Sequence, residues 1–463
     1  MNHRSRTVRR KMKIERQKTI DSPRDFKVMH QTLCINSIDF ETRNLFGYTE
    51  LAILPLVKNL RSIRLDCSKQ CRINRVTVQE TIDTAFIHDD PFSTFRDNFS
   101  SGREQTRSFS SFFAALQSCA DKCDADRNGG NLLIKFPYEI FDLADEHKLI
   151  RIGIEFNVEK PTSGLKFIFH PKLEGASWRE KASHVYTYRE PGHISNNCSW
   201  FPCVDAYSEL CAWKIEVSLD TALTAVCSGE LQKCHRLILK FSFFAVTYGV
   251  SYSSDLRRKN FVFSLNVPTP ACNIGICIGV FDIFVHPDMN ELSAFCPPQL
   301  LPLLKLTCQN LHKVFEFFEE LLSSRYPYGS MKICFVDDLP ILNIHSSALS
   351  YSTLILLNVK CLYHKKIIDQ VPLTRTAMAS GLASQFFGCY LVQRRFEDSW
   401  VCYGLASYLA NMYCQKAFGN NEYMYQIYED ISQLVEYESK WGPVILNEYG
   451  EEDNKADIRK KRE

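Results

Sequence analysis

The pattern of apolar and polar positions divides the chain into two parts with different periods. From about residue 26 to residue 285, apolar residues form short β-branched runs with partial alternation, the pattern of strands that bury one face. Residues 149–170 predict two strands joined by a Pro-Thr-Ser-Gly turn. We therefore expect a large mixed or antiparallel β domain. Its other predicted strands lie at 33–40, 51–57, 72–78, 213–220 and 260–268.

Two segments of this β-rich part differ from the rest. Residues 97–111 are polar and rich in serine, which predicts a mobile loop. Residues 236–252 are strongly apolar, but Lys240 interrupts them, and tyrosine, serine and threonine dilute their end. A membrane-spanning helix needs about 20 predominantly apolar residues. The segment therefore predicts a strand or an inserted hairpin in a chain without membrane contact.

After residue 296 the apolar positions take the period of helices. A turn at 326–329 leads into a predicted strand, and Gly419 stands where a helix C-cap is expected. The expected fold class is α+β, with a large β-rich N-terminal domain followed by a mainly helical domain. The predicted helices cover 303–322, 374–392, 399–419 and 421–439.

Charge is concentrated at the two ends of the chain. The formal net charge is only +2, so the whole chain lacks the strongly basic character of a nucleic-acid-binding domain. Residues 1–23 are basic and predict a disordered tail, compatible with a nuclear-localisation signal. No apolar segment follows these charges, which argues against a secretory signal. Residues 447–463 predict a second charged, unstructured tail.

The 19 cysteines indicate a reduced protein. Without a secretory signal, a chain of this size is expected in a reducing compartment with free thiols. Cys67/Cys71 and Cys119/Cys123 have CxxxC spacing, but no second close pair of ligands accompanies them, as a structural zinc site requires. Cys272/Cys277, with four residues between, has none either. We expect buried, inert thiols.

Three motifs, in order along the chain, carry a family resemblance. Residues 200–205 read WFPCVD, residues 384–388 read SQFFG, and residues 400–404 read WVCYG. They resemble the WFPCxDEP signature, the end of the HExxHQWFG helix and the WLNEG segment of the M1 aminopeptidase family. In such enzymes two histidines one helical turn apart bind Zn²⁺, the glutamate between them is the general base, and a later glutamate is the third ligand.

The resemblance implies that this chain has lost the catalytic chemistry of that family. Ser380 and Ser384 occupy the two histidine positions, Gly381 the general-base position and Tyr403 the third-ligand position. A serine hydroxyl is a poor Zn²⁺ ligand, and a phenol with a pKa of about 10 rarely ionises to become one. Residues 347–351 replace the GxMEN loop that binds a substrate's free amine. We expect no catalytic, cofactor-binding or metal-ligating residues.

The aromatic residues of these motifs are predicted to be structural. Trp200 and Phe201 are expected in the core of the β-rich domain, and the Phe386–Phe387 pair is expected to pack its helix against the body of the second domain.

Further blocks resemble one non-catalytic branch of M1-like proteins, the TFIID subunit 2 family of TATA-binding-protein-associated factors. The resemblance covers roughly residues 24–445 and implies a nuclear, non-enzymatic scaffold that supports core-promoter recognition and RNA polymerase II initiation. The implied partners are the TATA-binding protein, its other associated factors and core-promoter DNA. These blocks are 30–40, 68–76, 200–220, 295–305, 314–329 and 372–390.

The resemblance also implies a division into domains, and this chain differs from the family pattern at two places. The expected domains are a β-rich one at 24–290, with a possible insertion at 236–252, and an incomplete peptidase-like helical one at 291–446. The family continues where this chain has its charged end, so we expect uncovered apolar helix faces and poor solubility. Two alternatives stay open: a peptide-binding inactive peptidase homologue outside TFIID, and an aminopeptidase with unusual ligands.

Overall fold

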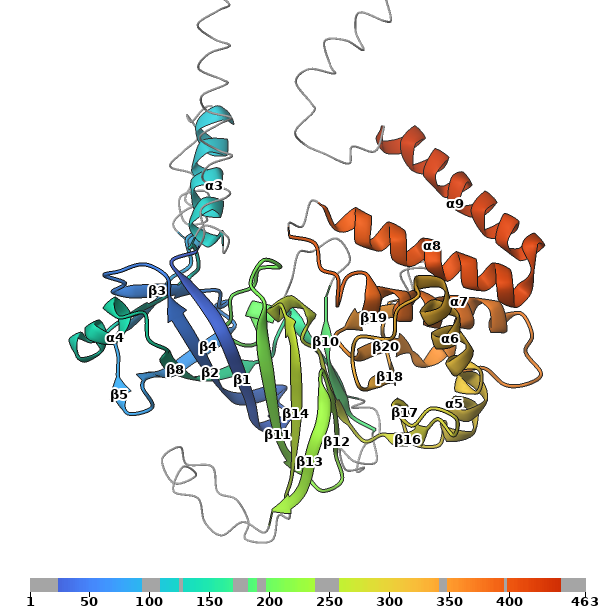
Figure 1. Ribbon diagram of the computed structural model, residues 1–463, viewed down its shortest axis with the longest axis horizontal. Helices are drawn as coiled ribbons and strands as arrows, with labels where there is room; N and C mark the ends of the chain where they lie inside the picture. Colours follow the sequence, from blue (N-terminus) through green and yellow to red (C-terminus); the bar gives the residue numbers. More distant parts are fainter. Residues whose placement is uncertain are drawn as a thin grey trace, which may run out of the picture.

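The computed structural model describes residues 24–93, 109–124, 128–169, 182–189, 197–237, 258–340, 348–394 and 398–442. Both predicted tails, most of the predicted loop at 97–111 and the apolar segment beyond Leu237 lie outside the described residues. Residues 109–111, placed in that loop by their serine content, instead begin a helix, α3 (Phe109–Cys123). Figure 1 shows α3 projecting from one end of the β-rich part.

A mixed eight-stranded sheet forms the body of the first part, as predicted. Its order is β13-β14-β11-β1-β2-β8-β4-β5, and β1 pairs antiparallel with β2 but parallel with β11. Alternate residues of β2 are buried, which explains the alternation in its sequence. The strands are β1 (Phe26–Asp39), β2 (Asn44–Pro55), β4 (Cys71–Val78), β5 (Ile82–Asp83), β8 (Ile150–Glu159), β11 (Cys211–Asp220), β13 (Glu230–Leu237) and β14 (Arg258–Thr269).

Two smaller sheets complete the β-rich part. The strands predicted on either side of the turn at 161–164 both form, but they enter different sheets, since β8 pairs with β2 and β9 pairs with β10. One sheet has the order β12-β15-β10-β9 and the other β3-β7-β6. Their strands are β3 (Ser62–Leu65), β6 (Phe86–His88), β7 (Leu132–Lys135), β9 (Gly164–Ile168), β10 (His184–Tyr188), β12 (Thr224–Cys227) and β15 (Ile276–Gly279).

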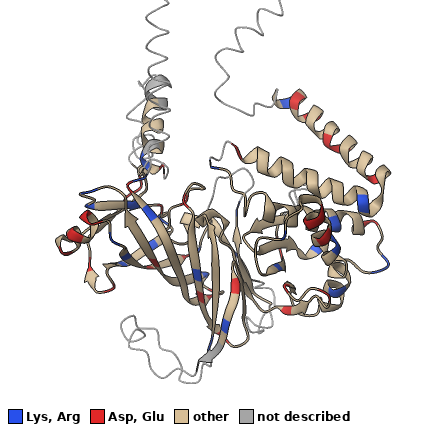
Figure 2. Cartoon of the chain, viewed as in Figure 1, with Lys and Arg blue, Asp and Glu red and all other residues tan. Residues whose placement is uncertain are grey.

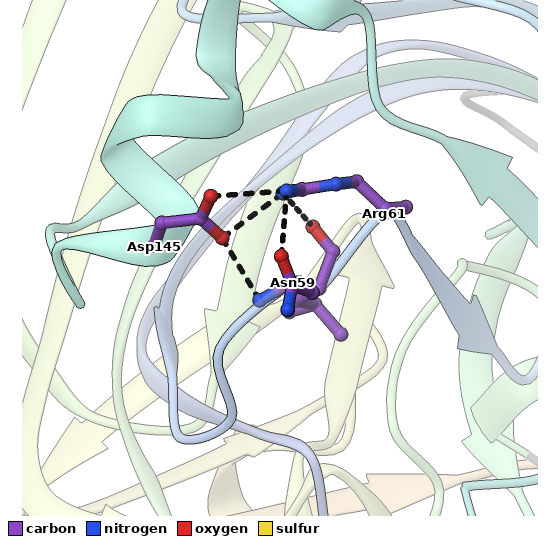
Figure 3. Close-up of polar contacts among 4 residues, drawn as sticks. Asn59, Arg61 and Asp145 are labelled. Carbon is purple, nitrogen blue, oxygen red and sulfur yellow. Dashed lines mark hydrogen bonds and ion pairs between the residues drawn. The ribbon is translucent and has the colours of Figure 1, made fainter.

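An ion pair holds the short helix α4 (Phe141–Asp145) beside the loop that precedes β3 (Figure 3). The Arg61 guanidinium contacts both carboxylate oxygens of Asp145, at 3.1 and 2.9 Å, and its carbon lies 4.0 Å from the centre of the Phe141 ring. The Asn59 N–H donates to the same carboxylate. The hydrogen bond from Arg61, followed by that from Asn59, lowers the pKa of Asp145, so the pair stays charged at neutral pH.

A five-stranded sheet with helices forms the second part, on the right of Figure 1. The order is β16-β17-β18-β20-β19, and β18 pairs parallel with both β17 and β20. The strand predicted after the turn at 326–329 is β18. The elements are β16 (Asp282–Val285), β17 (Leu292–Cys296), β18 (Met331–Val336), β19 (Ala348–Tyr351), β20 (Leu354–Asn358), α5 (Leu301–Cys308), α6 (Leu311–Leu322), α7 (Gln370–Phe386), α8 (Ser399–Phe418) and α9 (Asn420–Trp441).

Two predicted helix boundaries were wrong. The helix expected at 303–322 is two helices, α5 and α6, separated at Gln309 and Asn310, because asparagine competes for backbone hydrogen bonds and favours helix ends. The helix expected at 374–392 ends at Phe386. There the chain turns through Gly388, whose φ of 125° lies in the region that favours glycine. The predicted C-cap at Gly419 is confirmed.

Buried apolar residues form one cluster in the β-rich part, one around α5–α8 and a third between the sheets. Cys67, Cys71, Cys272 and Cys277 are buried free thiols, as predicted. The expectation of burial was wrong for Cys119 and Cys123, which are only partly buried because they lie on α3, the helix that projects from the β-rich part. Burial raises the pKa of the Cys67 thiol well above its ordinary value, so this thiol is unreactive. Among the described residues, no helix is long and apolar enough to cross a membrane.

The outer helices α8 and α9 expose many apolar side chains. Figure 2 shows α8 with almost no charge along its length. Trp400 is 46% exposed and Tyr408 is 55% exposed on α8, while Tyr428 is 66% exposed and Trp441 is 69% exposed on α9. Surfaces of this kind reduce solubility when nothing covers them.

Candidate functional site

The two serines at the histidine positions lie on α7, one helical turn apart, in the arrangement that the motif requires. The Ser380 side chain is buried, and the residue is 4% exposed. Ser384 is half-buried, and its Oγ donates to the Ser380 carbonyl at 2.9 Å. This hydrogen bond is internal to the helix, a common arrangement for a helical serine. The hydroxyl of Ser384 is thus engaged with its own backbone.

The general-base position is closed by neighbouring strands. A Cβ added to Gly381 would lie 2.9 Å from Ile355 Cγ2 and 3.2 Å from Ala348 Cβ. The Ser350 hydroxyl, on β19, donates to the Gly381 carbonyl at 3.1 Å. Glycine therefore allows α7 to pack closely against β19 and β20, and this packing occupies the direction that a glutamate side chain would take.

We predict that Gly381→Glu destabilises the fold by about 1–3 kcal/mol, because its side chain overpacks the contact with Ile355. Denaturant unfolding of the purified chain measures the change. The matched control is Gly404→Glu on α8, where a Cβ meets nothing within 4 Å and helix propensity favours the substitution. Equal stability of Gly381→Glu and the unchanged protein would contradict close packing at this position.

The third-ligand position faces a cation. Tyr403, on α8, is 52% exposed, and it interacts electrostatically with Arg189, which also interacts with Tyr207 and Tyr351. Burial favours the neutral guanidinium, but these groups outweigh it and raise the pKa of Arg189, so the side chain remains charged. Its Nη1 donates to the Tyr207 hydroxyl at 3.5 Å. The sequence motifs gave no signal for Arg189, which lies outside them.

The residues present do not fit the zinc ion of the M1 enzymes. Ser380 and Ser384 offer neutral hydroxyls, Gly381 offers no base, and a guanidinium lies near Tyr403. The positive charge of Arg189, which interacts with Tyr403, disfavours a divalent cation at the third-ligand position. Within the part of the chain that the structure describes, the grouping of three potential metal ligands is elsewhere, at His286, Asp288 and His312.

The aromatic anchors lie where the sequence predicted. Trp200 and Phe201 are both fully buried, with their rings edge to face at 4.5 Å, and the Trp200 Nε1–H donates to Asn197 Oδ1 at 3.0 Å. Phe386 is 5% exposed and contacts the Tyr326 ring at 5.8 Å, so it packs α7 against the second core as expected.

The arrangement of a saddle-like β part and a helix-covered sheet is an M1 aminopeptidase-like fold. Solved structures support this class. Yeast LTA4 hydrolase with bestatin aligns with a TM-score of 0.63, covering 90% of this chain and 52% of that chain at 17% identity. The native yeast enzyme aligns with a TM-score of 0.62 at 17% identity, covering 89% of this chain and 52% of that chain. At this identity the likeness shows the fold alone. No protein-family model matches the chain.

Sequence comparison finds relatives at higher identity. The chain is similar to proteins named transcription initiation factor TFIID subunit 2, which confirms the predicted resemblance. It is 39% identical to the Danio rerio protein over 94% of this chain and 40% identical to the Gallus gallus protein over 93% of it. The Drosophila melanogaster protein is 36% identical over 92%. The chain spans about a third of the length of these relatives, 34%, 34% and 32% respectively.

Proposed function

We propose that this chain is a non-catalytic scaffold portion of a TFIID subunit, which supports core-promoter recognition and RNA polymerase II initiation in the nucleus. The observation that carries the proposal is its identity of 36–40% to TFIID subunit 2 from three animals, over nearly the whole of this chain. Similarity at this level over hundreds of residues includes the body of both β-rich and helical parts, and so it supports a shared role as well as a shared fold.

The residues at the former site support the non-catalytic part of the proposal. Zn²⁺ activates water only when ligands fix it beside a base, and Ser380, Gly381, Ser384 and Tyr403 supply neither. A fold that has lost its chemistry can persist as a rigid platform, because function belongs to sites and not to folds. The buried aromatic and aliphatic clusters of both parts provide that rigidity.

The proposed partners are the TATA-binding protein, its other associated factors and, within the complex, core-promoter DNA. The competing proposal is a peptide-binding homologue that retains the old cleft outside TFIID. It rests on the shared fold alone, whereas the scaffold proposal rests on 36–40% identity to three relatives over nearly the whole of this chain. The scaffold function is therefore the better-supported of the two.

The test is affinity purification of the tagged chain from nuclear extract, with mass spectrometry of the associated proteins. We expect to recover the TATA-binding protein and several of its associated factors. A control variant, Ser384→Trp, fills the region of the former site and is expected to leave this association unchanged. Loss of the association in Ser384→Trp, together with loss of binding to a peptide library, would instead support the peptide-binding alternative.

Failure to recover any TFIID component with this chain leads to a second purification, with a gene product of the relatives' full length. Recovery with the longer product alone would place the partner contacts outside the present residues and would refute the proposal for this chain. Recovery with neither would refute membership of the complex altogether.

A further inference from the structure

A cluster of metal-ligating side chains lies at the edge of the five-stranded sheet, on elements other than α7 and α8. His286 follows directly after the edge strand β16, Asp288 lies in the same loop, and His312 is in the first turn of α6. Each side chain offers one ligand atom, and these atoms all lie within 4.8 Å of one another. None of the three belongs to a motif of the former peptidase site.

The two imidazoles meet nitrogen to nitrogen. His312 Nδ1 is 3.2 Å from His286 Nε2, and the rings are tilted by 47° with their centres 4.8 Å apart. In a tetrahedral zinc site with Zn–N bonds of 2.0–2.1 Å, two ligand nitrogens are separated by about 3.3–3.4 Å. The observed distance between the two nitrogens is therefore close to the value in a zinc site, and β16 and α6 need not move to bind the ion.

Local backbone structure fixes one ligand and leaves another adjustable. His286 is 1% exposed, its N–H donates to the Leu292 carbonyl at 2.9 Å, and the Leu292 N–H donates to Met289 at 3.0 Å. His312 is half-buried and Asp288 is exposed. The buried imidazole is thus held by a closed loop, while the exposed carboxylate can rotate toward an ion that enters from solvent.

We propose that His286 Nε2, His312 Nδ1 and the Asp288 carboxylate bind a Zn²⁺ ion, with a water molecule as the fourth ligand. Two imidazoles and one carboxylate form a donor set suited to zinc, whereas magnesium and calcium prefer sites built from oxygen ligands. The bound ion connects the loop after β16 to the start of α6. Its role is structural, since it joins the sheet edge to a helix that packs on the second core.

Ion binding requires a defined change of tautomer at His286. The Nδ1 of His286 accepts from the Asp288 N–H at 3.3 Å, so the proton resides on Nε2 and faces the Gln309 carbonyl at 3.1 Å. Zn²⁺ replaces the proton on Nε2, and Nδ1 takes up a proton, so the ring stays neutral. Two hydrogen bonds are lost, from Nε2–H to the Gln309 carbonyl at 3.1 Å and from the Asp288 N–H to Nδ1 at 3.3 Å, and the second is long and therefore weak. The Asp288 N–H has to turn away from the protonated Nδ1, which the exposed loop at Asp288 allows.

From the sequence we expected no metal-ligating residue, and these three residues form no recognisable motif along the chain. His286 and Asp288 have only one residue between them, but His312 is 26 positions away from His286 along the chain. The spacing resembles no standard zinc motif, and only the packing of α6 beside β16 brings the three side chains together.

The test uses the 463-residue chain, stripped with a chelator and then dialysed against zinc chloride, with metal content measured by mass spectrometry. We expect about one zinc per chain, and a loss of zinc affinity of at least roughly 10-fold in both His312→Gln and Asp288→Asn, since changing even a group that only orients a ligand costs roughly 10–100-fold. The matched control is His364→Gln, which replaces an exposed histidine outside the cluster and leaves zinc binding unchanged. Because Asp288 is exposed, Asp288→Asn tests the proposal even where His312→Gln unfolds, as judged by circular dichroism.

Zinc bound by the histidine cluster has to be distinguished from zinc bound by a cysteine, because Cys234 is an exposed thiol. Cobalt replaces zinc for this purpose: nitrogen and oxygen ligands give visible bands alone, whereas thiolate ligands add intense charge-transfer absorption in the near ultraviolet. Visible bands without that absorption, lost in Asp288→Asn, support the site. A thiolate signal, zinc content unchanged in both variants, or no stoichiometric zinc in the unchanged chain would each overturn it.

Discussion

Trp200→Ala is expected to lower the free energy of unfolding by about 3–5 kcal/mol, the usual cost of removing a large buried aromatic side chain. Trp200 is fully buried in the apolar cluster of the β-rich part, and the centre of its ring lies 4.5 Å from that of Phe201. The deletion leaves a cavity, and Asn197 Oδ1 loses the donor that it has in Trp200 Nε1–H. Denaturant unfolding followed by circular dichroism measures the change.

Two further variants separate packing from hydrogen bonding. Trp200→Phe keeps much of the volume and removes the N–H donor, so we expect a smaller loss than for alanine, of about 1–3 kcal/mol. Trp400→Ala, at a position that is 46% exposed on α8, is expected to change stability by less than about 1 kcal/mol. Equal effects at positions 200 and 400 would show that the WFPCVD segment does not lie in the core.

The sequence predicted those parts of the fold that depend on local periodicity. The apolar run at 51–57 predicted the end of β2, but the strand begins at Asn44, where polar and glycine positions interrupt the apolar pattern although alternate residues are still buried. The pairing of β1 with β11, parallel and more than 180 residues apart, could not be read from either strand, because backbone pairing leaves no local pattern. The same holds for β8 and β9, consecutive strands that enter different sheets.

At the candidate site, too, the sequence predicted what depends on local spacing and missed what depends on long-range packing. The motif spacing located Ser380, Ser384 and Tyr403 on two adjacent helices, since residues one turn apart share a helix face. Arg189 and the histidine cluster were missed because long-range packing brings them together from separate elements. Closure of the Gly381 position by Ile355 was equally inaccessible, since it depends on how closely α7 packs against β20.

Raising the pH from about 8 to about 10 is expected to stabilise the unchanged chain by about 2 kcal/mol relative to Lys332→Met. Lys332, on β18, is 6% exposed. Burial, only partly offset by Cys227 and Glu230, lowers the pKa of its ammonium group from 10.5 to about 8. Nζ donates to the Gly229 carbonyl and to Thr353 Oγ1, the latter at 3.1 Å. The side chain therefore joins the five-stranded sheet to the β-rich part.

The direction of the effect follows from proton binding. Below the folded-state pKa of about 8, lysine is charged in both states, and the folded protein bears the full cost of the buried charge. Between about 8 and 10.5 the unfolded chain binds more protons than the folded chain, so stability rises with pH through this range.

Other groups that titrate at alkaline pH are common to both proteins and cancel in the comparison with Lys332→Met, except Cys227, which interacts with Lys332. Burial raises the pKa of the Cys227 thiol far above its ordinary value, so this thiol stays protonated up to pH 10 in both proteins. Lys305→Met, which removes an exposed lysine on α5, controls for the loss of one surface charge and is expected to show no such pH dependence. Parallel unfolding curves of the unchanged chain and Lys332→Met at both pH values would show that Lys332 reaches solvent. In that case water would reach the contact between β18 and Gly229. The scaffold proposal needs a rigid connection between the two parts, and the apolar cluster between the sheets would then have to provide it alone.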